Sequence, residues 1–396
     1  MLDAVRNPYA PGAGNPPPEL AGRAPILAAA DTAFQRVARG RAAKSLILVG
    51  LRGVGKTVLL NRLDEIAQSL HFRTVMIEAH EAKPLPALLL PGLRSVLFAL
   101  STMEKGRIAG RRALRVLKSF VSGVKLKLGD VEVGLSIEPE AGVADSGDLE
   151  ADLADLFLAV GEAARSAERP VLIIIDEMQY LSQAEFGALI MAVHRVNQKS
   201  APLMLLGAGL PQTLGLAGDS KSYAERLFDY PAIGALSRAD AAEAIVAPAH
   251  DDGAIFDPEA VQRIIDVTQG YPYFLQQWAH DAWNAAETEV ITLADVARAN
   301  DTAIAKLDEN FFRVRFDRCT PSEKRYMRAL AELGPGAHRS GDVADVLGVK
   351  VTSVGPTRGK LIRKGMIYSP QHGDTAFTVP LFDAYMRRAM PDVERA

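Results

Sequence analysis

Short apolar runs alternate with helical patterns between residues 41 and 236 of this chain. Residues 45–50, SLILVG, predict a buried strand, and residues 57–70 predict a helix because their apolar side chains recur every three or four positions. Further strands are predicted at residues 73–79, 171–175, 203–207 and 232–236. Strands that alternate with helices pair in parallel, so the pattern predicts an α/β fold in which helices sandwich a parallel sheet.

The stretch between residues 83 and 147 interrupts this alternation. Within it, apolar and polar residues alternate on both sides of Gly129 and Asp130, and such a two-residue turn is typical of a β-hairpin. We therefore expect an inserted hairpin near residues 124–137, whose role the sequence does not indicate.

Proline-rich chain precedes the predicted α/β core, and helical patterns follow it. Residues 1–40 are predicted to be a proline-rich leader, and its segment from Pro8 to Pro18 is expected to be extended because prolines disfavour helical backbone. Ser237 is suited to cap the first helix after the core, Asp257 begins another, and Gly270 ends that one. These signals predict a helical subdomain, or lid, over residues 237–310.

Charge is unevenly distributed along the 396 residues. Apolar residues make up 48% and charged residues 23%, which is typical of globular proteins, and the formal net charge of −3 predicts no nucleic-acid partner by itself. Residues 311–396, however, hold 15 basic and 9 acidic residues, a net of +6. A second basic block, residues 105–127, is interpreted as a solvated helix face or as a second contact with a phosphate backbone. We expect a domain boundary near residue 311, between an acidic body and a basic tail.

Cysteine use and hydropathy predict the compartment. Cys319 is the single cysteine, which excludes an internal disulfide and a multi-cysteine zinc site, and the histidines show no metal-ligand spacing. The N-terminus lacks the apolar core of a signal peptide, and runs such as residues 171–175 are far shorter than a membrane span. The sequence predicts a cytoplasmic protein without a membrane partner.

Residues 50–57, GLRGVGKT, match the phosphate-binding pattern GxxxxGK[ST], and they stand between a predicted strand and a predicted helix. Glycine lets backbone N–H groups approach phosphate oxygens, and the helix N-terminus adds partial positive charge. Lys56 is expected to reach the β- and γ-phosphates, and the Thr57 hydroxyl to bind Mg²⁺. The full set of predicted nucleotide-binding residues in this segment is Gly50, Gly53, Val54, Gly55, Lys56, Thr57 and Val58.

A second element of the same chemistry follows at residues 171–179, VLIIIDEMQ. Five apolar residues predict a central strand, whose C-terminal end carries Asp176 and Glu177 to the sheet edge beside the phosphate loop. Asp176 is expected to hold Mg²⁺, and Glu177 to polarise the attacking water. This pair of acids favours hydrolysis of a nucleoside triphosphate over transfer to a small acceptor.

These two motifs, together with SYAERLF at residues 222–228 and GYP at residues 270–272, resemble the AAA+ ATPases of the origin-recognition and archaeal-type ATPase branch. The resemblance covers about residues 19–310. It implies a P-loop NTPase core over residues 41–236 followed by the lid, with ATP and Mg²⁺ as cofactors and assembly into a homo-oligomer when ATP binds.

The resemblance also implies roles for single residues outside the two motifs. Gly22 and Arg23 lie where this branch packs a turn against adenine, and Arg226 lies where it places an arginine finger, a catalytic role. Pro272 of the GYP turn is expected to lie at the nucleotide, although GYP replaces the arginine that many AAA+ lids supply. Residues 207–209, Gly-Ala-Gly, lack the polar side chain that is usual on the sensor strand, so hydrolysis is expected to be slow.

The basic tail resembles a winged helix. Three helices are predicted at residues 321–333, 341–348 and 352–365, followed by strands at residues 366–369 and 376–379. In a winged helix the third helix reads the DNA major groove. The predicted DNA-binding residues on it are Thr357, Arg358, Lys360, Arg363 and Lys364.

Three functions fit these observations. The first is an ATPase whose nucleotide state controls assembly and association with duplex DNA through the tail. The second is an ATP-controlled signalling or defence switch whose tail docks protein, because glycine–x–proline turns are typical of related signalling NTPases. The third is a nucleotide-binding scaffold that hardly hydrolyses ATP.

Overall fold

The structure is a computed structural model that describes residues 2–12, 15, 17–123, 138–221, 224–371 and 373–392. The predicted hairpin at residues 124–137 lies outside the described residues. The chain forms two compact units, each described here by itself. The α/β unit comprises Pro25–Gly50 and Leu59–Ala232, and the lid–tail unit comprises Met1–Ala24, Leu51–Val58 and Ile233–Ala396.

A parallel sheet forms the centre of the α/β unit, and its strand order is β2-β3-β4-β1-β5. Its strands are β1 (Ser45–Gly50), β2 (Arg73–Glu78), β3 (Val171–Asp176), β4 (Leu203–Gly209) and β5 (Phe228–Asp229). The short β6 (Ala232–Ile233) also pairs with β1, and the strand predicted over residues 232–236 is confined to these two residues. Every residue of β1, β3 and β4 is buried, as expected for strands that helices cover on both faces.

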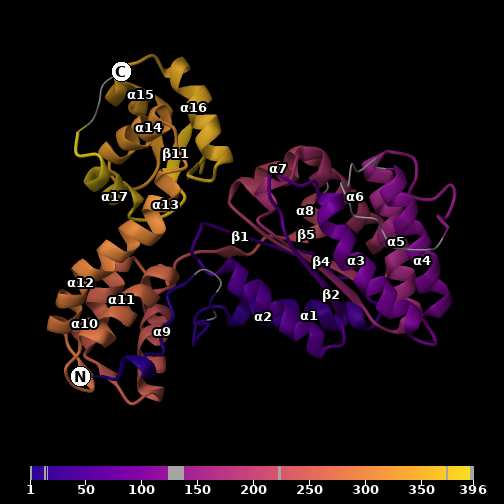
Figure 1. Ribbon diagram of the computed structural model, residues 1–396, viewed down its shortest axis with the longest axis horizontal. Coiled ribbons are helices and arrows are strands. Elements are labelled where there is room, and N and C mark those ends of the chain that lie inside the picture. Colours follow the sequence, from indigo (N-terminus) through magenta and orange to yellow (C-terminus); the bar gives the residue numbers. More distant parts are fainter. Residues whose placement is uncertain are drawn as a thin grey trace. The chain divides into compact units, whose positions relative to one another are not determined.

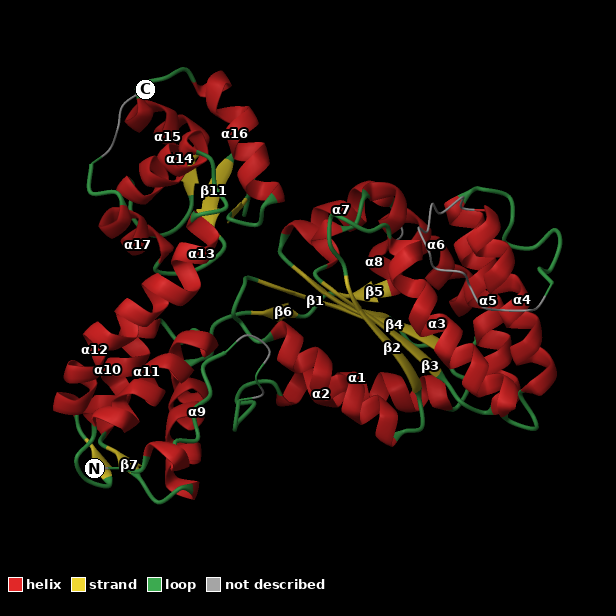
Figure 2. Ribbon diagram, in the orientation of Figure 1, coloured by secondary structure: helices red, strands yellow, loops and turns green. Residues whose placement is uncertain are grey.

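Helices cover both faces of this sheet, with α1 and α2 on one side and α3 to α6 on the other (Figure 2). The helices are α1 (Ala24–Ala38), α2 (Lys56–Ser69), α3 (Leu85–Thr102), α4 (Arg107–Gly123), α5 (Leu149–Ala167), α6 (Gln183–Gln198), α7 (Gln212–Ser220) and α8 (Ala224–Leu227), with a 3-10 turn, η2 (Met178–Tyr180). The predicted α/β fold class, a P-loop NTPase sheet between helices, is confirmed.

Helix α3 has the length and the apolar composition of a membrane-spanning helix, and it is the one such helix in the part of the chain that the structure describes. A helix of this length was not predicted, and Pro91 and Gly92 divide its apolar run in the sequence. A core helix has the same composition, and the leucines of α3 are buried where the helix packs against β2, α4 and α5.

The lid–tail unit contains α9 (Arg238–Asp251), α10 (Pro258–Thr268), α11 (Pro272–Ala285) and α12 (Leu293–Leu307), and β7 (Ile255–Phe256) pairs in parallel with β8 (Val290–Ile291). Ser237 caps α9 as predicted, since its hydroxyl accepts from the Asp240 N–H. Asp257 makes no such side-chain cap, and α10 ends at Thr268 because Gln269 already adopts the left-handed conformation before Gly270.

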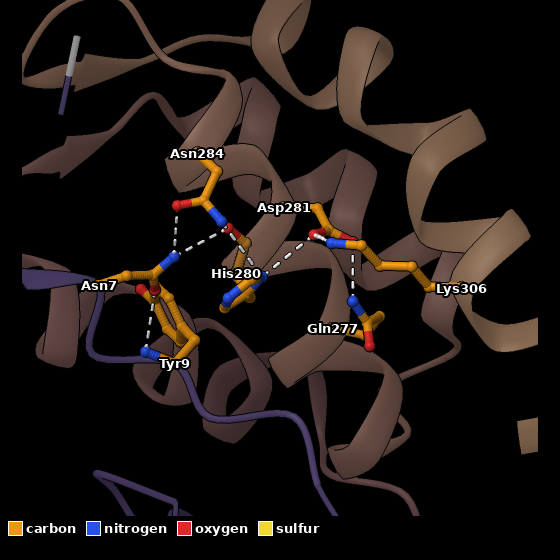
Figure 3. Close-up of polar contacts among 7 residues, drawn as sticks. All are labelled: Asn7, Tyr9, Gln277, His280, Asp281, Asn284 and Lys306. Carbon is orange, nitrogen blue, oxygen red and sulfur yellow. Dashed lines mark hydrogen bonds and ion pairs between the residues drawn. The ribbon is translucent and has the colours of Figure 1, made fainter. Parts of the chain in front are cut away.

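The first residues of the chain lie against the lid helices, with a 3-10 turn at η1 (Ala4–Arg6) (Figures 1 and 3). Asn7 donates to the His280 carbonyl and to Asn284 Oδ1, both at 3.0 Å, and the buried Tyr9 donates its hydroxyl to the Ile245 carbonyl. Burial raises the pKa of Tyr9, so its hydroxyl stays a donor. The start of the predicted leader is thus part of the lid.

A buried carboxylate joins α11 to α12. Asp281 accepts from Gln277 Nε2 at 2.7 Å and pairs with Lys306 Nζ, and His280 Nδ1 lies 3.1 Å from it (Figure 3). Burial alone raises the pKa of Asp281, but the bonds from His280, Lys306 and Gln277 outweigh it and hold the pKa below its usual value. This network fixes α11, whose N-terminus carries the GYP turn.

The tail begins within a continuous helical run. After α12 come a π-helical turn, η3 (Asp308–Phe312), α13 (Arg313–Phe316), α14 (Pro321–Glu332), β9 (His338–Arg339), α15 (Ser340–Leu347), α16 (Val351–Arg363), β10 (Ile367–Tyr368), β11 (Asp374–Phe377) and α17 (Phe382–Ala389). The antiparallel sheet has the order β10-β11-β9. The three predicted helices correspond to α14, α15 and α16, whereas β9 and α17 were not foreseen. The boundary predicted near residue 311 falls inside η3, where the chain continues without a linker.

Candidate functional site

The segment that follows β1 forms a tight loop and then begins α2 at Lys56. Gly53 and Gly55 have φ angles of 80° and 90°, a conformation that side chains with a Cβ rarely adopt. A Cβ at Gly53 would lie 3.1 Å from Tyr271 Cε1, so this glycine is also required by the closeness of the lid turn. The glycine pattern in the sequence therefore corresponds to real backbone requirements.

Three successive carbonyls of the loop are hydrogen-bonded to residues of the leader and the lid. The Tyr271 hydroxyl donates to Arg52 O, the Tyr273 N–H to Gly53 O at 3.3 Å, and Arg23 Nη2 to Val54 O at 3.2 Å. A trans peptide points its N–H opposite to its C=O. The N–H groups of residues 53–55 therefore point away from these partners, as in the backbone nests that bind anions.

Lys56 is the first residue of α2, and its side chain is 7% exposed. Its Nζ donates to the Leu51 carbonyl at 2.8 Å, so the ammonium bends back over the loop. Thr57 follows on the first turn of α2, where the helix N-terminus adds partial positive charge. The loop, the lysine and the helix start together present the donors that a phosphate chain requires.

The two predicted acids lie at the end of β3. Asp176 is 5% exposed, and its Oδ1 accepts from the Glu177 N–H at 2.7 Å. This bond accompanies a left-handed Glu177 with a φ of 54°. Strand β4 alone separates β3 from β1, and all three strands are parallel. Asp176 and Gly50 therefore end strands at the same edge of the sheet.

Gln179 is a site residue that the sequence analysis missed. Its Nε2 donates to Glu177 Oε2, and its Oε1 accepts from the Leu210 N–H at 3.0 Å. It therefore joins the acid pair to the end of β4, the strand at the sensor position, which lacks a polar side chain of its own. The signal in the sequence that could have indicated Gln179 is its position two residues after Glu177.

Packing explains why Gly207 and Gly209 of the sensor strand carry no polar side chain. A Cβ at Gly207 would lie 2.2 Å from Met178 Sδ, and one at Gly209 would lie 2.2 Å from Thr213 Oγ1. These neighbours fill the space that a polar side chain would need.

The leader turn and the GYP turn contact the phosphate loop in ways that differ from the expectation. Gly22 has a φ of 70° and lies against Asp240. Arg23 is 9% exposed and donates to Gly234 O at 2.7 Å as well as to Val54 O. The contact of this turn with adenine stays a prediction. Pro272 is the first residue of α11, and it is the tyrosines on either side of it that reach the loop.

The remaining predicted residues lie on surfaces. Arg226 is exposed on the four-residue α8, and its neighbours at positions 222 and 223 lie outside the described residues. On α16, Lys360 and Arg363 are exposed and Thr357 is half-buried. Two further predicted DNA contacts have partners inside the tail: Arg358 binds Thr375 Oγ1 and Ser369 Oγ, both at 2.8 Å, and Lys364 pairs with the buried Glu323 at 2.7 Å. These bonds hold α16 to β11 and α14, so Arg358 and Lys364 serve the tail's own structure.

Within the described part of the chain, no group of three or more histidine, cysteine, aspartate or glutamate side chains is arranged to hold a metal ion. Cys319 is buried, and burial raises the pKa of its thiol to about 11.

Comparisons with known proteins agree with this geometry. A sequence model of the AAA ATPase domain family matches residues 19–206, and one of a domain of unknown function (DUF8462) matches residues 309–386. A search of curated proteins found no match. The Walker-type ATPase of Pyrococcus abyssi has a similar structure, with a TM-score of 0.58 and 14% identity over 93% of this chain and 96% of that chain. The ORC2 protein of Aeropyrum pernix, solved in ADPNP-ADP complexes, has a TM-score of 0.52 and 15% identity over 96% and 97% of the two chains.

At these identities the structural likeness shows the fold alone, which is that of a P-loop NTPase. The family match narrows the class of protein, because residues 19–206 are similar to the AAA ATPase domain. Fold and family match together support an ATP-binding P-loop ATPase.

Proposed function

We propose that this protein binds MgATP at the loop of residues 50–57 and hydrolyses it. The observation that carries the proposal is the set of three loop carbonyls bound by Tyr271, Tyr273 and Arg23, because each bond fixes a peptide whose N–H points away from that partner. Such preorganised donors stabilise charge without a reorganisation cost during the reaction. Release of inorganic phosphate from MgATP by the purified chain is the direct test.

The chain's own residues fit Mg²⁺ and the chemistry of hydrolysis. The Asp176 carboxylate and the Thr57 hydroxyl are oxygen donors of the kind that Mg²⁺ prefers, and the bound ion supplies positive charge to the phosphates. Lys56 binds phosphate, and Glu177 accepts a proton from the attacking water. Gln179 orients Glu177 through its amide, since it is itself fixed by the Leu210 N–H.

Assembly is the second part of the proposal, with Arg226 acting on the nucleotide of a neighbouring copy. Arg226 is exposed and forms no ion pair within the described residues. We expect Arg226→Ala to bind MgATP normally and to hydrolyse it about 100-fold more slowly, because one preorganised cation at the reacting phosphate is lost. Mixing it with Lys56→Ala should restore part of the activity through hybrid interfaces.

Light scattering measures the oligomeric state of the same samples. Arg195→Ala is the matched control, because Arg195 is another exposed arginine of the α/β unit. A chain that stays monomeric at every ATP and protein concentration would remove the role in trans.

Association with duplex DNA through a winged-helix tail is the third part. Lys360 and Arg363 are the exposed cations of α16, the helix that a winged helix presents to the major groove. We expect Lys360→Ala with Arg363→Ala to weaken binding to a random duplex and to flatten the slope of log affinity against log salt by about two, at ~0.9 per phosphate contact. Fluorescence anisotropy over a salt series, with and without MgATP, measures this slope.

Arg195→Ala with Lys199→Ala is the matched control, because it removes the same charge from the end of α6, outside both basic blocks. An unchanged slope in the α16 variant would reject α16 as the DNA contact.

A signalling switch is the second candidate function, and one observation favours it. Tyr273, whose N–H binds the phosphate loop, stacks on Phe311 at 4.6 Å, and the neighbouring Phe312 packs against Phe382 and Tyr385 of the tail at 5.6 and 5.3 Å. An unbroken series of contacts thus connects the loop to the tail. If the full chain shows no duplex affinity at low salt, the tail is better explained as a protein-docking module.

A further inference from the structure

Arg315, a residue without an assigned role, lies among groups that surround the phosphate loop. It belongs to α13, which connects the lid to the tail. Its Cζ lies 3.9 Å from the centre of the Phe311 ring, and Phe311 stacks on Tyr273. Tyr273 and Tyr271 are the residues that bind the Gly53 and Arg52 carbonyls. The guanidinium is therefore held on an aromatic support that reaches the loop through Phe311 and Tyr273.

The charged groups that act on Arg315 are both cations, Arg52 of the loop and Arg318. Among the described residues, no carboxylate lies within ion-pair distance of it, and its hydrogen bond goes to the Phe311 carbonyl of its own helix. Burial, and next the charge of Arg52, lower the pKa of Arg315 to about 10.

Placing the Arg315 guanidinium in this environment costs free energy when no anion is bound nearby. A cation taken partly out of water is normally paired with an acid, and a second cation nearby makes the lack of one worse. An anion bound in the loop would offset the charge of Arg315. Guanidinium groups are well suited to phosphate, since their planar donors match its oxygens.

We propose that Arg315 contacts the phosphates of the bound nucleotide and so connects nucleotide binding to the start of the tail. The proposal rests on the nucleotide site described above. It adds a phosphate contact from α13, a helix that the phosphate-binding motif does not predict to be part of the nucleotide site. Because only residues 317–320 separate α13 from α14, the same contact holds the start of the tail near the loop when nucleotide is present.

The test measures binding of MgATP and MgADP to the full chain by calorimetry. Arg315→Gln removes the charge, and we expect affinity for both nucleotides to fall about 10- to 100-fold, as for the loss of a charge-assisted hydrogen bond. Arg313→Gln, on the same helix but exposed and 3.7 Å from Asp317, is the matched control and should bind like the wild type. Thermal unfolding without nucleotide checks that each variant is folded.

A second variant protects the test against misfolding. Arg315→Met keeps an unbranched side chain that packs on the Phe311 ring, so it is expected to fold and to show the same loss of affinity. Wild-type affinity in either folded variant would overturn the role of Arg315 while leaving the nucleotide site intact. Absence of MgATP binding in the wild type would instead reject the nucleotide site, and this inference with it.

Discussion

Lys56→Ala is expected to abolish measurable MgATP binding. The Lys56 ammonium is 7% exposed and folds back onto the Leu51 carbonyl, so its charge is held in the loop where the phosphates are expected to bind. Loss of a buried charge-assisted contact of this kind weakens binding by about 3 kcal/mol or more, which is at least ~100-fold. Isothermal titration calorimetry of the folded variant measures the change.

Lys44→Ala is the control for this experiment. Lys44 precedes β1, at the end of the strand opposite to the loop, and pairs with Asp229 on the surface at 2.9 Å. Such exposed pairs contribute little, so both stability and MgATP affinity should remain close to wild type. Undiminished binding by Lys56→Ala would show that the loop is not the phosphate site.

Glu177→Gln is expected to keep MgATP binding and to lose turnover by ~10²–10⁴-fold. The amide preserves the size of the side chain and can still bond to Gln179, but it cannot take the proton of the attacking water. Steady-state phosphate release, together with calorimetry on the same sample, separates the two effects.

Glu78→Gln is the matched control for Glu177→Gln. Glu78 ends β2 directly beside Asp176 in the sheet register, yet it is exposed and has no assigned role. Its turnover should match wild type. Normal phosphate release by Glu177→Gln would reject Glu177 as the group that activates water.

Local patterns were sufficient to predict the central strands and the phosphate loop. The run VLIII marks β3 because a strand that helices cover on both faces must be apolar throughout, and the glycines of the loop mark positive φ angles. They were not sufficient for β5 and β9, since strands of two residues carry too few side chains for a period to appear. Helix α3 escaped notice as a single element because Pro91 lies inside it.

Side-chain partners were the least predictable part of the site. Arg23 and Arg358 are basic residues in segments that were predicted to bind a ligand. A sequence pattern predicts ligand contact for every basic residue in such a segment. The structure gives them carbonyl and hydroxyl partners that lie 31 and 17 residues away in the chain. Whether a cation faces a ligand or its own protein depends on these distant contacts.

The sequence by itself determined the class of chemistry, because phosphate binding requires a particular order of glycines, lysine and hydroxyl within eight consecutive residues. The tertiary structure alone decided what surrounds that loop: the tyrosines of the GYP turn on its carbonyls, Gln179 on Glu177, and Arg315 on its aromatic support. The physical reason is range. Backbone conformation follows from neighbouring residues, whereas hydrogen bonds and ring contacts join groups that only folding brings within a few ångströms of one another.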